Sequence, residues 1–292
     1  MLDQFHFYYN QRGSKDFCSS YFSIRYRIFK WSQLNLRIII ILSNFIIGHN
    51  AFLQSYYGYG DNGQYYQIDI DNSSCGCEEQ LLGSNTDMAF GFTFCPNGNF
   101  YYPNMDGLLQ MDLTTGDILL ISSWPLGFDP NFLGIAAETD STFFLIENPS
   151  GSLLYWNIDA NTIIDLGPVG VNPWADLCLA DGQYYTSSAA GIWNINVNDP
   201  GSSSLIIPYI PPYRFSSLSA SIYCHTRVAI LSISNGPEFL AYVSLIDGAI
   251  KQICQVSDGM HYLTSELEFI SPTVCDNTLD LDCNDSSGAT GA

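Results

Sequence analysis

The sequence predicts an all-β protein, a β-propeller of about five four-stranded blades that is closed by a strand near its C-terminal end. A short phrase recurs with a period of ~44 residues, within the range of propeller blades. Each copy contains short apolar segments separated by turns, and no stretch after residue 50 has helical periodicity over more than two turns. The first copy lacks its first strand and a single strand follows the fifth copy, which indicates a closed ring.

Residues 1–50 contain a basic leader followed by an apolar run. Six basic residues precede residue 38, and residues 38–47 (IIIILSNFII) carry no charge. This is the layout of a signal peptide, and the run is shorter than the ~20 residues of a membrane-spanning helix. We therefore expect export to the extracellular space or the cell surface. A membrane-retained signal anchor, a start-site error over residues 1–30 and a buried strand are the alternatives.

The composition excludes several classes of protein. The chain has 292 residues, of which 47% are apolar and 13% are charged, and its net charge is −20. Disordered chains combine low hydrophobicity with high charge density, so this chain is expected to fold. Nine basic residues against 29 acidic ones offer no electrostatic footprint for nucleic acid, and we expect no DNA or RNA partner.

The blade repeat consists of a turn, alternating apolar residues and a small polar residue. The polar residues give spacings of 43, 45, 39 and 48, and they are Asp69, Asp112, Asn157, Asn196 and Ser244. The second copy predicts strands at 87–94, 99–103, 108–113 and 117–121, and the fourth predicts strands at 174–180, 183–186, 191–197 and 204–209. A β-sandwich predicts no such period. A fragment of a larger propeller is the second alternative.

The two ends of the array predict how it closes. Residues 51–82 contain the second, third and fourth strands of a blade, and residues 263–270 (LTSELEFI) alternate as a first strand does. Pairing these two segments completes the first blade and removes an exposed sheet edge. We therefore expect the propeller to occupy residues 51–270.

Residues 271–292 are acidic and depart from the repeat. They contain Leu279-Asp280-Leu281-Asp282, between Cys275 and Cys283. The repeats resemble the propeller modules of large secreted surface and adhesion proteins of gliding bacteria, and this phrase resembles the opening strand of the cadherin-like or immunoglobulin-like domain that often follows. The resemblance implies that this chain is part of a larger multidomain adhesion protein. Residues 271–292 are then either an acidic linker or the start of a truncated adhesion domain.

Eight cysteines follow the leader, an even number that suits disulfide pairing in an oxidising compartment. Cys275 and Cys283 are close enough in sequence to close a small loop, and we expect a disulfide there. Cysteines inside apolar strands are equally well explained as small buried hydrophobic residues. Zinc is not indicated, because the sequence lacks Cys-x2-Cys pairs and paired histidines.

One face of the predicted propeller carries aromatic and basic residues. This face is formed by the connectors between consecutive blades and by the turns between second and third strands, where a rigid scaffold positions binding loops. Aromatic side chains there offer apolar area to sugars or peptide side chains, although they also pack as wedges between blades. The candidate ligand-binding residues are Trp124, Phe128, Trp174, Tyr213, Arg214, His261 and Tyr262.

Acidic residues leave two further possibilities open. Asp280, Asp282 and Asp285 are closely spaced oxygen ligands that suit calcium, but the Gly and final Glu of the twelve-residue calcium loop are absent, and a solvated linker is the alternative. Glu138, Asp176 and Glu266 fall on predicted first strands, which line a propeller channel, where paired carboxylates could cleave a glycosidic bond. Motifs for a nucleophile elbow, a zinc protease or a phosphate loop are absent.

These observations predict a non-enzymatic, secreted or surface-displayed propeller that binds a protein or glycan ligand. No cofactor is expected except calcium in the acidic segment. The first alternative is a propeller hydrolase of the glycosidase or lactonase type that uses channel carboxylates or a metal. The second is a structural spacer domain without a ligand. Contact with a membrane is expected only through an uncleaved N-terminal segment.

Overall fold

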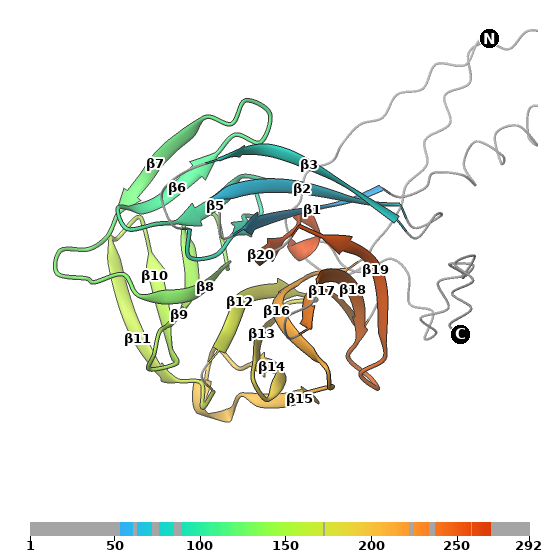
Figure 1. Cartoon of the computed structure of the whole chain (residues 1–292). Coiled ribbons are helices and arrows are strands. Elements are labelled where there is room, and N and C mark those ends of the chain that lie inside the picture. The colour runs from blue at the N-terminus through green and yellow to red at the C-terminus, as the bar shows by residue number, and fades with distance from the viewer. Residues whose placement is uncertain are drawn as a thin grey trace, which may run out of the picture. The chain divides into compact units, whose positions relative to one another are not determined.

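The protein is a five-bladed β-propeller with four antiparallel strands in each blade (Figure 1). The computed structural model describes residues 53–60, 63–71, 76–84, 89–171, 173–221, 223, 225–233, 237–257 and 259–269. Within these ranges the only helical elements are two short 3-10 helices. The predicted fold class and blade number are therefore confirmed.

Each blade runs from an innermost strand at the axis to an outermost strand at the rim. Blade 1 contains β20 (Met260–Thr264), β1 (Leu53–Gly60), β2 (Gln64–Asp71) and β3 (Gly76–Ser84). Blade 2 contains β4 (Thr93–Phe94), β5 (Phe100–Pro103), β6 (Gly107–Met111) and β7 (Ile118–Ser123). Blade 3 contains β8 (Phe132–Ala137), β9 (Thr142–Glu147), β10 (Ser152–Asn157) and β11 (Thr162–Pro168).

The other two blades follow the same order. Blade 4 contains β12 (Pro173–Ala180), β13 (Gln183–Ser188), β14 (Gly191–Ile195) and β15 (Ser204–Pro208), with the 3-10 helix η1 (Pro200–Ser202) before its last strand. Blade 5 contains β16 (Tyr213–Ser219), β17 (Thr226–Ile233), β18 (Glu238–Ser244) and β19 (Ile250–Val256). Five buried hydrophobic clusters, one between each pair of adjacent blades, form the core.

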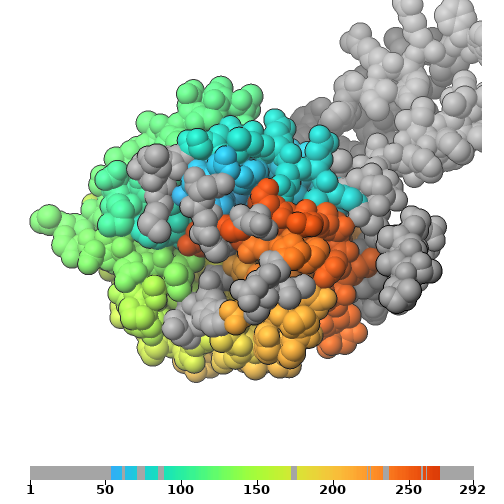
Figure 2. Space-filling view, in the orientation of Figure 1, coloured from blue at the N-terminus to red at the C-terminus, as the bar shows by residue number. Residues whose placement is uncertain are grey.

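The ring closes at the place that the sequence predicts, because β20 pairs with β1. Figure 2 shows these two ends of the propeller, red-orange and blue, side by side. The closing strand begins earlier and ends sooner than the predicted 263–270: it covers Met260–Thr264, so only Leu263 and Thr264 are shared with the prediction, and Glu266–Phe269 form the 3-10 helix η2. The alternating apolar residues at 267 and 269, which suggested a longer strand, instead pack against the hydrophobic clusters near the axis. Leu267 packs against the clusters on both sides of blade 5, and Phe269 against those on both sides of blade 3.

The first strand of blade 2 is also shorter than the predicted 87–94, since β4 covers only Thr93–Phe94. Residues 87–88 lie outside the described part of the chain. Gly91 has a φ of 123°, and the N–H of Phe92 donates to the carboxyl group of Asp176 in blade 4. The main chain just before Thr93 therefore forms a hydrogen bond at the axis and does not continue β4 as a regular strand.

All five blades share a β-bulge between the third and the outermost strand. In blade 4 the register of β14 against β15 shifts between Ile192 and Trp193, which leaves Ile206 without a partner on β14. A bulge changes the side-chain alternation locally, so the outermost strand can turn one aliphatic side chain inward. Each extra residue packs against a cluster between blades, and the other four are Leu82, Ile121, Leu166 and Ile253.

A disulfide joins the rims of blades 5 and 1. It links Cys77 on β3 to Cys254 on β19, which are 177 residues apart in the sequence. Beside it, the carboxylate of Glu79 accepts hydrogen bonds from the main-chain N–H (2.8 Å) and the hydroxyl (2.6 Å) of Ser257. The seam between the last blade and the first is therefore linked at the rim as well as by strand pairing at the axis.

Two of the cysteines whose pairing the sequence left open are not in disulfides. Cys95 and Cys178 are free thiols buried between blades, as the alternative of small hydrophobic residues expected. Burial raises the pKa of both thiols. The predicted disulfide between Cys275 and Cys283 lies outside the described residues.

Candidate functional site

The face formed by the connectors between blades contains a pocket of about 220 Å³ at the junction of blades 4 and 5. Four residues line it: Ser188 at the end of β13, Ala189 in the next turn, Tyr209 in the connector after β15, and Arg214 on β16. These segments belong to the face on which the sequence predicts ligand binding. Arg214 is the predicted ligand-binding residue that lies in the pocket wall.

The turn between β13 and β14 gives the pocket a pre-formed wall. The Oγ of Ser188 accepts hydrogen bonds from the N–H of Ala190 and from Nε1 of Trp193, both at 3.0 Å. Gly191 has a φ of 129°, and a Cβ there would lie 1.9 Å from a main-chain oxygen of β15, so a side chain does not fit. The N–H of Tyr209 donates to the carbonyl of Ala190 at 2.7 Å, which ties the connector to the turn.

Arg214 places a positive charge at this pocket. It is one of three basic residues after residue 38, with Arg227 and Lys251, and its side chain is exposed. The Tyr209 side chain is 41% exposed, so an aromatic ring is also available at the pocket. A guanidinium group binds carboxylates through paired hydrogen bonds and stacks on planar groups. The pocket is therefore suited to a ligand that combines an anionic oxygen group with an apolar face.

Two of the predicted aromatic residues pack between blades 2 and 3. The ring of Trp124 stacks on that of Trp156 with centroids 4.2 Å apart, and its Nε1 donates to the carbonyl of Asn104 at 2.9 Å. The ring of Phe128 contacts Trp124 with centroids 5.2 Å apart. Trp124 and Phe128 thus pack between two blades, which is the alternative to ligand binding that the sequence left open.

The other predicted residues of this face are spread around the ring. Tyr213 precedes Arg214, and its hydroxyl accepts a hydrogen bond from Nε2 of Gln252 at 3.2 Å. Tyr262 on β20 contacts the aromatic rings of Tyr59 and Phe92, each with centroids 6.3 Å apart. Trp174 lies in β12 and His261 in β20. Of the predicted set, the structure thus places Arg214 in the pocket wall, whereas the neighbouring Tyr213 packs against the hydrophobic cluster between blades 4 and 5.

At the axis, Asp176 on β12 is fully buried and connects three blades. Its Oδ1 accepts hydrogen bonds from the N–H of Leu177 (2.8 Å) and of Ile135 (3.2 Å), and its Oδ2 accepts one from Phe92 (3.4 Å). Burial raises the pKa of Asp176 well above its ordinary value, and the nearby charge of Glu268 raises it further, although the three N–H groups act in the opposite direction.

Two glycines make room for this carboxyl group. A Cβ on Gly91 would lie 2.8 Å from Oδ1 of Asp176, and one on Gly134 would lie 2.9 Å from the same atom. The main chains of blades 2 and 3 therefore approach Asp176 closely because both positions lack a side chain. This environment resembles a structural junction more than an open catalytic site.

Glu268 in η2 is a second buried carboxyl group at the axis, and sequence reasoning missed it. Its Oε1 accepts a hydrogen bond from the Thr264 hydroxyl (2.5 Å), and its Oε2 accepts one from Thr93 (3.2 Å). Burial raises the pKa of Glu268 to about 8, against the lowering effect of these hydroxyl groups. The Thr93 hydroxyl also accepts from the N–H of Ala137 at 3.0 Å. Glu268 thereby ties η2 to blades 1 and 2, and Thr93 extends the connection to blade 3.

The carboxylates considered for a hydrolase occupy different environments. Asp176 is buried, whereas Glu138, which follows β8, and Glu266, in η2, are exposed. Glu138 accepts a hydrogen bond from the Thr142 hydroxyl at 2.9 Å. Within the described ranges, no group of three or more His, Cys, Asp or Glu side chains could hold a metal ion. The calcium candidates Asp280, Asp282 and Asp285 lie outside those ranges.

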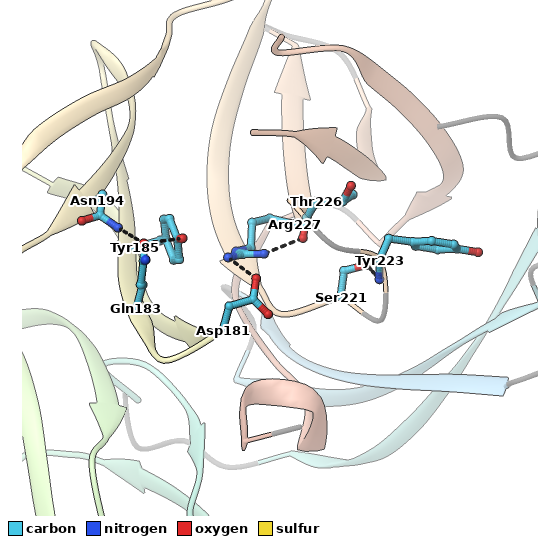
Figure 3. A network of polar contacts seen from close by, with 8 residues as sticks. All are labelled: Asp181, Gln183, Tyr185, Asn194, Ser221, Tyr223, Thr226 and Arg227. Carbon is cyan, nitrogen blue, oxygen red and sulfur yellow. Dashed lines mark hydrogen bonds and ion pairs between the residues drawn. The ribbon is translucent and has the colours of Figure 1, made fainter. Parts of the chain in front are cut away.

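A second arginine joins blades 4 and 5 at the opposite end of their strands (Figure 3). Arg227 is 1% exposed, and its Nη2 lies 3.1 Å from Oδ2 of Asp181 in the β12–β13 turn. Its Nη1 donates to the carbonyl of Thr226 at 2.7 Å, and its guanidinium carbon lies 4.3 Å from the ring centre of Tyr185. Arg227 therefore has a structural role, in contrast to the exposed Arg214.

No family model and no curated protein matches the chain. Among solved structures it is similar to a chain of a nidogen/laminin complex, with a TM-score of 0.49 and 11% identity over 72% of this chain and 97% of that one. It is also similar to TolB from Acinetobacter baumannii (TM-score 0.49, 14% identity, 78% of this chain and 59% of that one). A protein of unknown function from Bacteroides caccae gives a TM-score of 0.49 and 9% identity over 72% of this chain and 98% of that one.

Similarities at this level of identity concern the fold alone, and the propeller assignment rests on the strand order of the five sheets. In the part of the chain that the structure describes, no helix has the length and apolar character needed to span a membrane.

Proposed function

We propose that this chain is an exported, non-catalytic binding module that recognises a protein or glycan ligand through the pocket between blades 4 and 5. The observation that carries the proposal is the pocket itself, where exposed Arg214 and Tyr209 stand beside a wall fixed by hydrogen bonds. The chemistry of these two side chains favours a ligand with a carboxylate, such as an acidic sugar or an acidic side chain of another protein.

Export and a place in a larger surface protein belong to the same proposal. Disulfides persist in oxidising compartments, and the bond between Cys77 and Cys254 fits such a compartment. The basic leader before an apolar run fits secretion independently of the disulfide. An adhesion role is supported by the resemblance of the repeats to surface-protein modules.

The environment of Asp176 favours binding over hydrolysis. A catalytic carboxyl group must reach the bond that it protonates or attacks. Asp176 is 0% exposed, and both of its oxygens already accept main-chain hydrogen bonds. A hydrolase that used Asp176 would therefore require the axis to open, whereas the pocket at Arg214 is accessible from solvent.

Binding assays with acidic and neutral probes test the proposed function. The probes are immobilised oligosaccharides that contain uronic acids, neutral oligosaccharides, and a peptide rich in Asp and Glu, at ~0.15 M salt, where the Debye length is ~8 Å. We expect binding to an acidic probe, with Arg214→Ala weakening it at least ~10-fold, or about 1.4 kcal/mol. Lys251→Ala is the matched control, because it removes the same charge from β19.

Three outcomes would contradict the proposal. Binding that survives Arg214→Ala would place the ligand elsewhere. Failure of every probe to bind would favour the spacer alternative. Release of sugar from a glycoside, abolished by Asp176→Asn, would favour the hydrolase.

A further inference from the structure

The Ser188 hydroxyl in the pocket wall has both of its acceptor positions occupied. A serine oxygen carries one hydrogen that it can donate and two lone pairs that can accept. The N–H of Ala190 and Nε1 of Trp193 each donate to Oγ of Ser188 at 3.0 Å, and neither of these groups can accept in return. Both lone pairs are therefore used, and the hydroxyl hydrogen remains as a donor.

The pocket is the place where this hydrogen can find an acceptor. Ser188 is only 5% exposed, and it lines the pocket. In the part of the chain that the structure describes, no oxygen accepts the hydrogen of its hydroxyl group. A nearly buried donor without an acceptor costs stability, which a ligand with an acceptor restores. The wall therefore presents one fixed donor to whatever occupies the pocket.

Arg214 adds a cationic donor to the same wall. Its guanidinium group has five N–H groups and no acceptor. A carboxylate has two oxygens that only accept, so one oxygen suits Ser188 and the other suits Arg214. A primary amide of the same shape has one oxygen and one NH2 group, and its NH2 group would meet a donor of the wall. The two donors together therefore select a carboxylate over its amide.

The size of the pocket and its aromatic ring indicate what carries the carboxylate. The volume of about 220 Å³ is below the ~300–1,000 Å³ of most small-molecule sites, so the pocket accepts one compact group. Tyr209 lines it and is 41% exposed, and an aromatic ring of this kind packs against the C–H groups of a sugar. A single sugar ring with a carboxyl substituent has both the apolar face and the pair of acceptors.

The net charge of the chain favours a glycan over an acidic protein as the ligand. A protein partner in a stable complex buries ~800 Å² on each side, and an acidic partner would bring many negative charges to a chain whose own net charge is −20. A neutral glycan that ends in an acidic sugar brings one carboxylate, and this group would enter the pocket beside Arg214.

We propose that the pocket binds one uronic acid residue of a glycan and that Ser188 determines its specificity, by donating a hydrogen bond to one carboxylate oxygen while Arg214 pairs with the other. This inference rests on the proposed function, because it names the ligand of the same pocket. It adds the residue that distinguishes an acidic sugar from a neutral one.

Two matched oligosaccharides test the role of Ser188. One is a neutral oligosaccharide that ends in glucuronic acid, and the other is the same molecule with its carboxyl group converted to a primary amide. We expect the wild type to bind the acid more tightly, and the ratio of the two dissociation constants to fall at least ~10-fold in Ser188→Ala. The acid loses a hydrogen bond in this variant, whereas the amide loses an unfavourable contact between two donors. Surface plasmon resonance at ~0.15 M salt measures both constants.

Trp193→Phe separates the donor from the turn that holds it. This variant removes the Nε1 hydrogen bond to Ser188 and keeps the Ser188 hydroxyl. A loosened turn would lower the affinity for both oligosaccharides, and we expect Trp193→Phe to retain the wild-type ratio even so. Far-UV circular dichroism shows whether the variants keep the native fold.

The outcomes that overturn this inference differ from those that overturn the proposed function. If Arg214→Ala weakens binding of the acid but Ser188→Ala leaves the ratio unchanged, Ser188 has no role in specificity and the proposed function stands. An equal fall of the ratio in Ser188→Ala and Trp193→Phe would assign the effect to the turn. Binding of the acidic peptide but of neither oligosaccharide would replace the glycan by a protein ligand. Failure of every probe to bind would contradict the inference and the proposed function together.

Discussion

Blades 3 and 4 follow each other directly in the chain, and at the axis the carboxyl group of Asp176 on β12 accepts the N–H of Ile135 on β8. Blades 5 and 1 come from opposite ends of the propeller. Their seam combines the pairing of β20 with β1, the Glu79–Ser257 hydrogen bonds and a disulfide. Closing a long loop costs more chain entropy than docking two blades that share a short connector. The comparison shows that the disulfide lies at the seam where closing the ring costs the most chain entropy.

The largest expected effect comes from removing the axial carboxyl group. Asp176→Ala would leave three buried N–H groups without an acceptor, and each such loss costs ~1–3 kcal/mol. We expect the free energy of unfolding to fall by about 4 kcal/mol in urea denaturation, near the lower end of the ~3–9 kcal/mol that three such losses imply.

Asp176→Asn is the conservative control and should cost about half as much, because the amide oxygen still accepts hydrogen bonds. Asp159→Ala, at an exposed turn, should change the free energy of unfolding by no more than ~0.5 kcal/mol. Equal losses for Asp176→Ala and Asp159→Ala would show that the axis does not depend on this carboxyl group.

The next effect concerns the seam. Replacing both Cys77 and Cys254 by Ser removes a cross-link between residues 177 positions apart. We expect a loss of about 3 kcal/mol in the free energy of unfolding, since native disulfides typically contribute ~2–4 kcal/mol. A reducing agent should lower the wild type to the value of the double variant and leave the variant itself unchanged. No difference between oxidised wild type and double variant would mean that the seam is closed by strand pairing alone.

A further effect, which is gradual because it is spread over several pH units, distinguishes the axis from the seam. Glu268 has a folded-state pKa of about 8 against an ordinary value of 4.5, so between these values the folded state holds a proton that the unfolded state releases. Its contribution to stability is complete below pH 4.5 and is lost as the pH rises through 8. Relative to Glu268→Gln, the wild type should therefore lose about 1.4 kcal/mol per pH unit in this window. The double cysteine variant should show the same dependence of the free energy of unfolding on pH. If the wild type and Glu268→Gln had the same dependence, the assigned role of Glu268 would be contradicted.

The sequence predicted the ring because its signals are periodic. Turns and alternating apolar residues recur in every blade, so the blade number and the strand that completes blade 1 followed from spacing alone. The same local alternation extended the closing strand too far, since Leu267 and Phe269 alternate in a 3-10 helix as they would in a strand.

The long-range contacts could not be derived in this way. The partners of Cys77 and of Asp176 depend on which blades meet in three dimensions, and eight cysteines allow many pairings. Arg214 was identified because connectors gather on one face of a propeller. Tyr209, which lines the same pocket, was missed because it reads as the end of a strand.

The disulfide also determines how the propeller would carry a mechanical load along its chain. Tension applied beyond Leu53 and Phe269 acts first on η2 and on the β20–β1 pair, because these elements hold both ends of the ring. After β1, β2 and β20 have been drawn out, the force passes through the bond between Cys77 and Cys254. The residues between those cysteines, the pocket included, then bear no tension. Under reducing conditions the same pull would reach every blade in turn.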